Sequence, residues 1–151
     1  MIVALLNLAC TSDKAPEVIG LEFVQRAESL IEEGSIRGLN DLVSSDYHDS
    51  DNRDRRDILG IASAYLIATG SLHLFTDLKS AQFAGGGRLQ CTLLVAFAAV
   101  PVEDRNLLPG INADLYWFDI ELIEEQRTWK VVSAAWEQAM LDDFFGDRRT
   151  R

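Results

Sequence analysis

The chain has 151 residues, 48% of them hydrophobic and 25% charged, which is the composition of a globular protein rather than of a disordered or fibrous one. This length fits a single domain that buries a sizeable core without a disulfide or a metal. Because the formal net charge is -10, the chain repels phosphate backbones and anionic lipid headgroups, and we expect no nucleic acid partner.

The first ten residues, MIVALLNLAC, form an apolar run that ends in a small residue and a cysteine. This order resembles the end of a bacterial lipoprotein signal, in which the cysteine becomes the lipidated N-terminus. Asn7 stands where an aliphatic residue is usual and no basic segment precedes the run, so a tail or strand packed on the core is the alternative. The run is also too short to span a bilayer. We expect residues 1–15 to be a leader and linker, with Cys10 as the lipidation site and the only membrane attachment.

The next part of the chain predicts three helices. The first begins at Pro16 and ends at Gly34, the second follows a capping Ser35, and the third covers residues 53–69 with Gly70 as its stop. The charged residues of the first helix, Glu28 among them, fall mostly on the side opposite its apolar stripe. The stripes of the three helices are Phe23, Ala27, Leu30 and Ile31; Ile36, Leu39, Leu42 and Val43; and Ile58, Ile61, Ala62, Tyr65, Leu66 and Thr69.

The segment SSDYHDSDNRDRRD, residues 44–57, precedes the third helix and is dense in aspartate and arginine. We interpret it as a helix start, with Asp51 as the cap, Asp54 as its return contact and the arginines in solvated ion pairs that each contribute little. A calcium loop is the alternative, but Arg53 occupies a ligand position and no mid-loop glycine follows. A single histidine, His48, is too little for a transition-metal site. We therefore expect no metal.

After Gly70 the period of the apolar residues changes to two, which predicts four strands. The first runs from Leu72 to the glycine-rich turn AGGGR, and the others are RLQCTLLVAFAAV, ADLYWFDIELIEE and TWKVVSAAWEQA. The second strand is apolar on both faces from Leu93 onward, so both faces of the sheet need cover. We expect helices on one face and a second copy of the chain on part of the other, which makes a homodimer through the sheet.

Helices followed by long antiparallel strands, with a closing W-x-V-x-x-A-x-W pattern (Trp129, Val131, Ala134, Trp136), resemble the nuclear transport factor 2-like superfamily, which includes the SnoaL-like proteins. The resemblance spans residues 18–140 and is to uncharacterised bacterial members. It implies an α+β fold in which N-terminal helices pack on a strongly curved antiparallel sheet, as a cone with a pocket inside. If the leader is genuine, we expect this chain on the periplasmic side of a membrane as a lipoprotein. Otherwise we expect it in the cytoplasm.

We expect residues 16–140 to form this cone and residues 141–151 to be a C-terminal tail. The tail carries Leu141, Phe144 and Phe145 and follows Met140, which is more apolar than a free end requires. It therefore either folds back over the sheet or the cone mouth, or docks on a partner.

Members of the superfamily include enzymes, such as ketosteroid isomerase, scytalone dehydratase and limonene epoxide hydrolase, and modules that only bind or assemble. The acid/base candidates here are Asp119, Tyr65 and His73, and the ligand-binding candidates are Tyr47 and Tyr65. Each has a structural alternative: Asp119 shares the phase of Glu121, His73 alternates with leucines, and the tyrosine rings can simply pack in the core.

No catalytic pair of the superfamily can be placed on these positions. We therefore expect a non-catalytic domain, without a cofactor, that binds a small apolar ligand or a protein. The alternative is a small lyase, isomerase or hydrolase that acts on an apolar substrate in the pocket.

Overall fold

A computed structural model describes residues 14–146, so the leader with Cys10 and the last five residues lie outside the described part. The chain forms three α-helices, four strands and two short 3-10 helices within this part. Their bounds are α1 Pro16–Glu32, α2 Ile36–Leu42, α3 Arg55–Thr69, β1 His73–Ala84, β2 Arg88–Ala98, η1 Arg105–Gly110, β3 Ala113–Glu125, β4 Thr128–Gln138 and η2 Leu141–Phe144.

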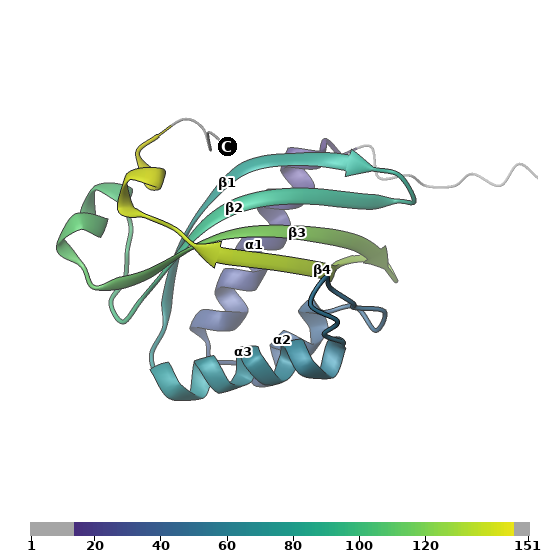
Figure 1. Cartoon of the computed structure of the whole chain (residues 1–151), viewed down its shortest axis with the longest axis horizontal. Helices are drawn as coiled ribbons and strands as arrows, with labels where there is room; N and C mark the ends of the chain where they lie inside the picture. Colours follow the sequence, from purple (N-terminus) through teal and green to yellow (C-terminus); the bar gives the residue numbers. More distant parts are fainter. Residues whose placement is uncertain (1–13, 147–151) are drawn as a thin grey trace, which may run out of the picture.

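The four strands form one antiparallel sheet in the order β1-β2-β3-β4, which curves over the helices as Figure 1 shows. The register of pairing shifts at two points, between Leu78 and Ser80 of β1 and at Glu121/Leu122, where β3 pairs with β4. Such bulges bend a strand and increase its twist. The structure confirms the predicted α+β class, with helices before a curved antiparallel sheet.

Helix α1 lies close against the inner face of the sheet. A Cβ atom added at Gly20 would lie 3.1 Å from a methyl carbon of Leu78 and 3.3 Å from the sulfur of Cys91. A side chain at this position would press on both of these neighbours, so glycine suits the close approach. Cys91 is buried beneath the helix, and burial raises the pKa of its thiol to about 11. The thiol is therefore protonated and unreactive at neutral pH.

Two clusters of buried residues lie on opposite faces of the sheet. The inner cluster joins the helices to the sheet through residues such as Phe23, Leu66 and Leu93. The outer cluster contains the apolar outer row of β2 together with Leu108 from η1 and Phe144 from η2, which pack on it. In Figure 1 these two short helices lie together at the end of the sheet where β1 and β3 begin. The chain therefore covers this part of the outer face by itself.

Arg105 of η1 ties this outer layer together. Its guanidinium donates a hydrogen bond of 3.0 Å to the carbonyl of Phe144 and lies 3.7 Å from the carboxylate of Asp77 on β1. Within residues 14–146, no helix is long and apolar enough to cross a membrane.

The segment before α3 starts a helix, but the predicted cap was wrong by three residues. Asp54, not Asp51, is the N-cap of α3, and it forms a reciprocal capping box with Asp57. The reason is a tight turn at residues 49–52, in which Asn52 has a φ of 59° and the amide of Asn52 donates to the carbonyl of Asp49. This turn keeps Asp51 outside the helix. Arg55, for its part, donates to the carbonyl of Asn40 at the end of α2.

Candidate ligand-binding site inside the cone

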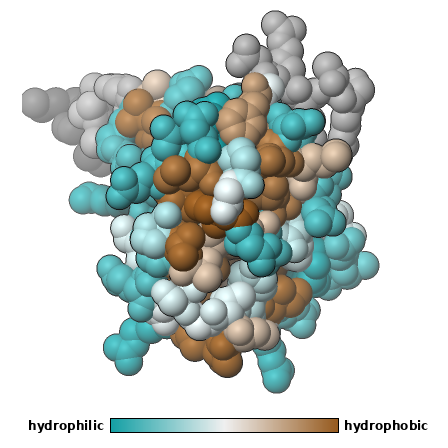
Figure 2. Space-filling view, turned by 90° about the vertical axis from the view of Figure 1, so that its left-hand side faces the viewer, coloured by the Kyte–Doolittle hydropathy of each residue, from teal (hydrophilic) through white to brown (hydrophobic). Residues whose placement is uncertain are grey.

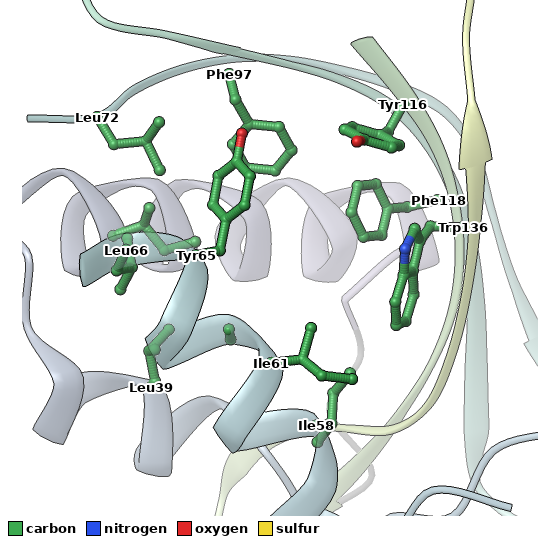
Figure 3. Close-up of a pocket in the computed structure, with 12 residues that line it drawn as sticks. Leu39, Ile58, Ile61, Tyr65, Leu66, Leu72, Phe97, Tyr116, Phe118 and Trp136 are labelled. Atoms are coloured by element: carbon green, nitrogen blue, oxygen red, sulfur yellow. The ribbon is translucent and has the colours of Figure 1, made fainter. Parts of the chain in front are cut away.

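A cavity of about 260 Å³ lies between the inner face of the sheet and the helices. Its helix side is aliphatic except for Tyr65, and its sheet side is aromatic, as Figure 3 shows. The aromatic wall consists of Tyr65 from α3, Phe97 from β2, Tyr116 and Phe118 from β3, and Trp136 from β4. Almost no polar atom is exposed inside, so the cavity favours an apolar occupant.

A second cavity of about 230 Å³ continues the first toward α1. The two share lining residues, including Ile58, Phe118 and Trp136. Small-molecule sites in proteins usually measure about 300–1,000 Å³, so the two cavities together have room for a small ligand.

The aromatic wall is held by ring contacts between neighbouring residues. The ring of Tyr65 meets that of Phe97 edge-on at 5.4 Å, and Phe97 meets Tyr116 in the same way at 6.0 Å. Phe118 stacks on Trp136 at 6.1 Å with an angle of 27° between the rings. Such pairs stabilise beyond their buried area, so the wall is preorganised without a ligand.

The hydroxyl of Tyr65 is a polar group at one end of the cavity. Its hydroxyl donates a hydrogen bond of 2.8 Å to the carboxylate of Asp114. Burial raises the pKa of the Tyr65 hydroxyl, and the bond to Asp114 and the charge of that carboxylate raise it further. Tyr65 is therefore a poor acid at neutral pH and acts here as a hydrogen-bond donor.

The outer side of the aromatic wall is supported by an arginine. The guanidinium carbon of Arg53 lies 4.3 Å from the ring centre of Trp136, which is a cation–π contact. The Nε of Arg53 donates a bond of 2.8 Å to Asp49, whose side chain is fully buried. The loop before α3 thus reaches the wall of the cavity through Arg53.

Asp49 is not part of a solvated network, and the prediction for this ion pair was wrong. Its carboxylate accepts from the hydroxyl of Tyr47, from Arg53, and from the backbone amides of Asp51 and Arg53. Burial alone would raise the pKa of Asp49, but these hydrogen bonds outweigh it and hold the pKa at about 2. Tyr47 therefore lines the second cavity with its ring, while its hydroxyl is taken up by Asp49.

Glu28 on α1 also lines the second cavity, although the helix pattern predicts a place on the solvent side. Its carboxylate accepts a hydrogen bond from the hydroxyl of Thr76 on β1. Burial raises the pKa of Glu28; the Thr76 bond opposes this and the nearby Glu32 adds to it. The signal was present in the sequence, because Val24, Glu28 and Ile31 follow one another at helical spacing.

The structure separates the three acid/base candidates. Tyr65 lines the cavity, whereas Asp119 is exposed on the outer face, where it accepts from Thr92. His73 alternates with the buried Leu72 and Leu74 and so points away from the inner face. These three residues therefore do not meet at one site.

Asp114 is the residue that sequence reasoning missed at the mouth of the cavity. It pairs with Phe97 across the strands and shares the phase of Tyr116 and Phe118, so it belongs to the inner row of β3. The sequence could have predicted this, since in a strand a carboxylate two positions before Tyr116 lies on the same face as Tyr116.

No protein-family model matches the chain, and no curated protein matches it in sequence. Solved structures do match its fold. A candidate dehydratase of the NTF2-like family from Streptomyces avermitilis is 15% identical, with 86% of this chain and 99% of that chain covered and a TM-score of 0.63. The protein Aln2 from another Streptomyces strain is 12% identical, with 87% and 96% covered and the same score of 0.63.

An NTF2-like protein of unknown function in nutrient uptake from Rhodospirillum rubrum is 19% identical, with 80% of this chain and 98% of that chain covered and a TM-score of 0.53. At these identities the likeness concerns the fold, and the activity has to be argued from the residues of this chain.

Proposed function

We propose that this chain, which has the nuclear transport factor 2-like fold, binds a small apolar ligand inside its cone and does not transform it. The observation that carries the proposal is the aromatic wall around a cavity with almost no exposed polar atoms. A core formed only for stability fills its interior to high density, and an open apolar space of this size costs free energy. A bound ligand offsets that cost.

Acid/base catalysis is the second candidate, and Glu28 is the observation in its favour. A carboxyl group with a raised pKa inside an apolar space has the properties of a general base. Two observations favour binding instead. The carboxylate of Glu28 is occupied by Thr76, and the second cavity exposes no polar atom to an occupant.

The test is a titration of the purified protein with N-phenyl-1-naphthylamine, a neutral apolar dye that fluoresces when it leaves water. We expect saturable binding to the wild-type chain and at least tenfold weaker binding to Ala62→Phe, because Ala62 lines both cavities and a phenyl group there takes up space where they meet. The matched control is Ala64→Phe on the exposed side of the same helix, which should bind the dye like the wild type.

Circular dichroism identifies any variant that fails to fold, and Ala62→Leu provides a smaller filling residue if phenylalanine is too large. The proposal is wrong if the folded wild type does not bind the dye, or if folded Ala62→Phe and Ala62→Leu bind it unchanged.

A further inference from the structure

The polar groups that an occupant of the cavity could meet gather at one end of it. Figure 3 shows the hydroxyl oxygens of Tyr65 and Tyr116 at the upper end of the cavity, away from Ile58 and Ile61. Asp114 lies at the same end, because it accepts the hydrogen bond of Tyr65. These three residues, Tyr65, Asp114 and Tyr116, are the mouth residues.

The mouth residues lie at the end of the molecule where β1 and β3 begin. Figure 2 views the molecule from this side and shows apolar side chains at the surface among hydrophilic ones. Asp114 is exposed and Tyr65 and Tyr116 are half-buried, so a ligand that fills the cavity can keep one end near water. The ligand that fits is thus apolar along its body and polar at one end.

The charge of Asp114 at the mouth determines which polar group on a ligand can bind there. A carboxylate has about four acceptor positions and no donor, and Tyr65 uses one oxygen of Asp114. The remaining positions can accept an O–H or N–H from a ligand. None of the residues that line the two cavities, all of which lie in the described part of the chain, is lysine, arginine or histidine. A carboxylate on the ligand would therefore meet a like charge beside an apolar wall, without a cation to offset it.

We propose that the cone selects apolar ligands that carry a hydroxyl or a protonated amine and rejects those that carry a carboxylate, with Asp114 as the discriminating residue. This inference rests on the proposed binding function. Because Asp114 is exposed, solvent screens part of its charge. We therefore expect the affinities of the two ligand classes to differ by a factor of about ten rather than by a factor of thousands.

The experiment is displacement of N-phenyl-1-naphthylamine at pH 7 by three probes with the same apolar chain: decylamine, decanol and decanoate, each below its micelle concentration. For the wild type we expect decylamine and decanol to displace the dye at concentrations about tenfold or more below that of decanoate. In Asp114→Asn this gap should shrink to about threefold or less, because the amide keeps the shape and loses the charge. The matched control is Asp119→Asn, a carboxylate on the outer face of the same strand, which should keep the tenfold gap.

The outcomes separate this inference from the proposed function. If the folded wild type does not bind the dye, the binding function itself fails. If the dye binds and decanoate displaces it as well as decanol does, the binding function stands and the role of Asp114 is refuted. A gap that persists in Asp114→Asn also refutes that role.

Discussion

At the scale of single residues, Asp49 links a polar loop to the wall of the cavity. Its buried carboxylate holds Arg53, and Arg53 lies over Trp136. A buried charge is tolerated only when its hydrogen bonds are satisfied, and Asp49 has four donors around it. The aspartates of this loop thus include one buried anchor, Asp49, and one helix cap, Asp54.

We expect Asp49→Asn to lower the free energy of unfolding at pH 7 by about 2 kcal/mol, the scale of a hydrogen bond to a charged group. The pKa of about 2 in the folded chain lies below the unfolded value of about 3.9. The stabilisation by the Asp49 carboxylate is therefore complete when the pH is above the pKa of the unfolded chain. It is lost as the pH falls through the pKa of the folded chain, with roughly half remaining at pH 3. Urea unfolding of wild type and variant at both pH values measures this.

The control is Asp51→Asn. Asp51 pairs with the same arginine, but its side chain is 70% exposed, so the change should cost less than about 0.5 kcal/mol at either pH. Equal costs at positions 49 and 51 would refute the anchor role of Asp49.

At the scale of elements, η1 and η2 provide the cover that was expected of a second copy of the chain. The outer row of β2, with Leu94, Ala96 and Ala98, is buried under them. Phe144 is the central residue of this cover, with no exposed surface and a ring 6.3 Å from that of Phe75. The two-faced apolar pattern of β2 is therefore explained within one chain.

We expect Phe144→Ala to reduce the free energy of unfolding by about 3–5 kcal/mol, the usual cost of removing a buried phenyl group. Its neighbour Phe145 is 48% exposed, and Phe145→Ala should cost less than about 1 kcal/mol. Chemical denaturation followed by circular dichroism compares the two. Similar small costs would mean that η2 does not pack on the sheet in solution.

At the scale of the whole molecule, we propose a homodimer that uses the part of the outer face beyond η1 and η2. This part carries charges of both signs, including the ion pair of Arg88 with Glu121 at 2.7 Å. Two copies related by a two-fold axis bring the same patch together, so opposite charges can pair across the axis. An interface of this composition is polar and depends on the ionic strength.

We expect sedimentation velocity of the purified chain to give a dimer at low salt that dissociates as the salt concentration rises to about 0.5 M, where charges are screened within a few ångströms. Glu121→Arg, which reverses one sign in the patch, should weaken the dimer, while Glu22→Arg on α1 should leave it unchanged. A monomer at every protein and salt concentration would refute the proposed dimer.

The sequence by itself determined the elements and their order, because the spacing of apolar residues depends only on the local geometry of helices and strands. The switch from a helical period to a period of two at Gly70 is confirmed, and so is the curved antiparallel sheet behind the helices. The place of Tyr65 on the apolar stripe of α3 was also readable, since a single helix fixes which residues share a face.

Only the tertiary structure decided which polar side chains enter the interior, because burial depends on segments that are distant along the chain. Glu28 faces the cavity because Thr76 of β1 lies across from it, and Asp114 meets Tyr65 from 49 positions away. Asp49 is buried because Tyr47 and Arg53 close around it. The cavity itself results from the curvature of the sheet over α3, a property of the assembled layers that no single element contains.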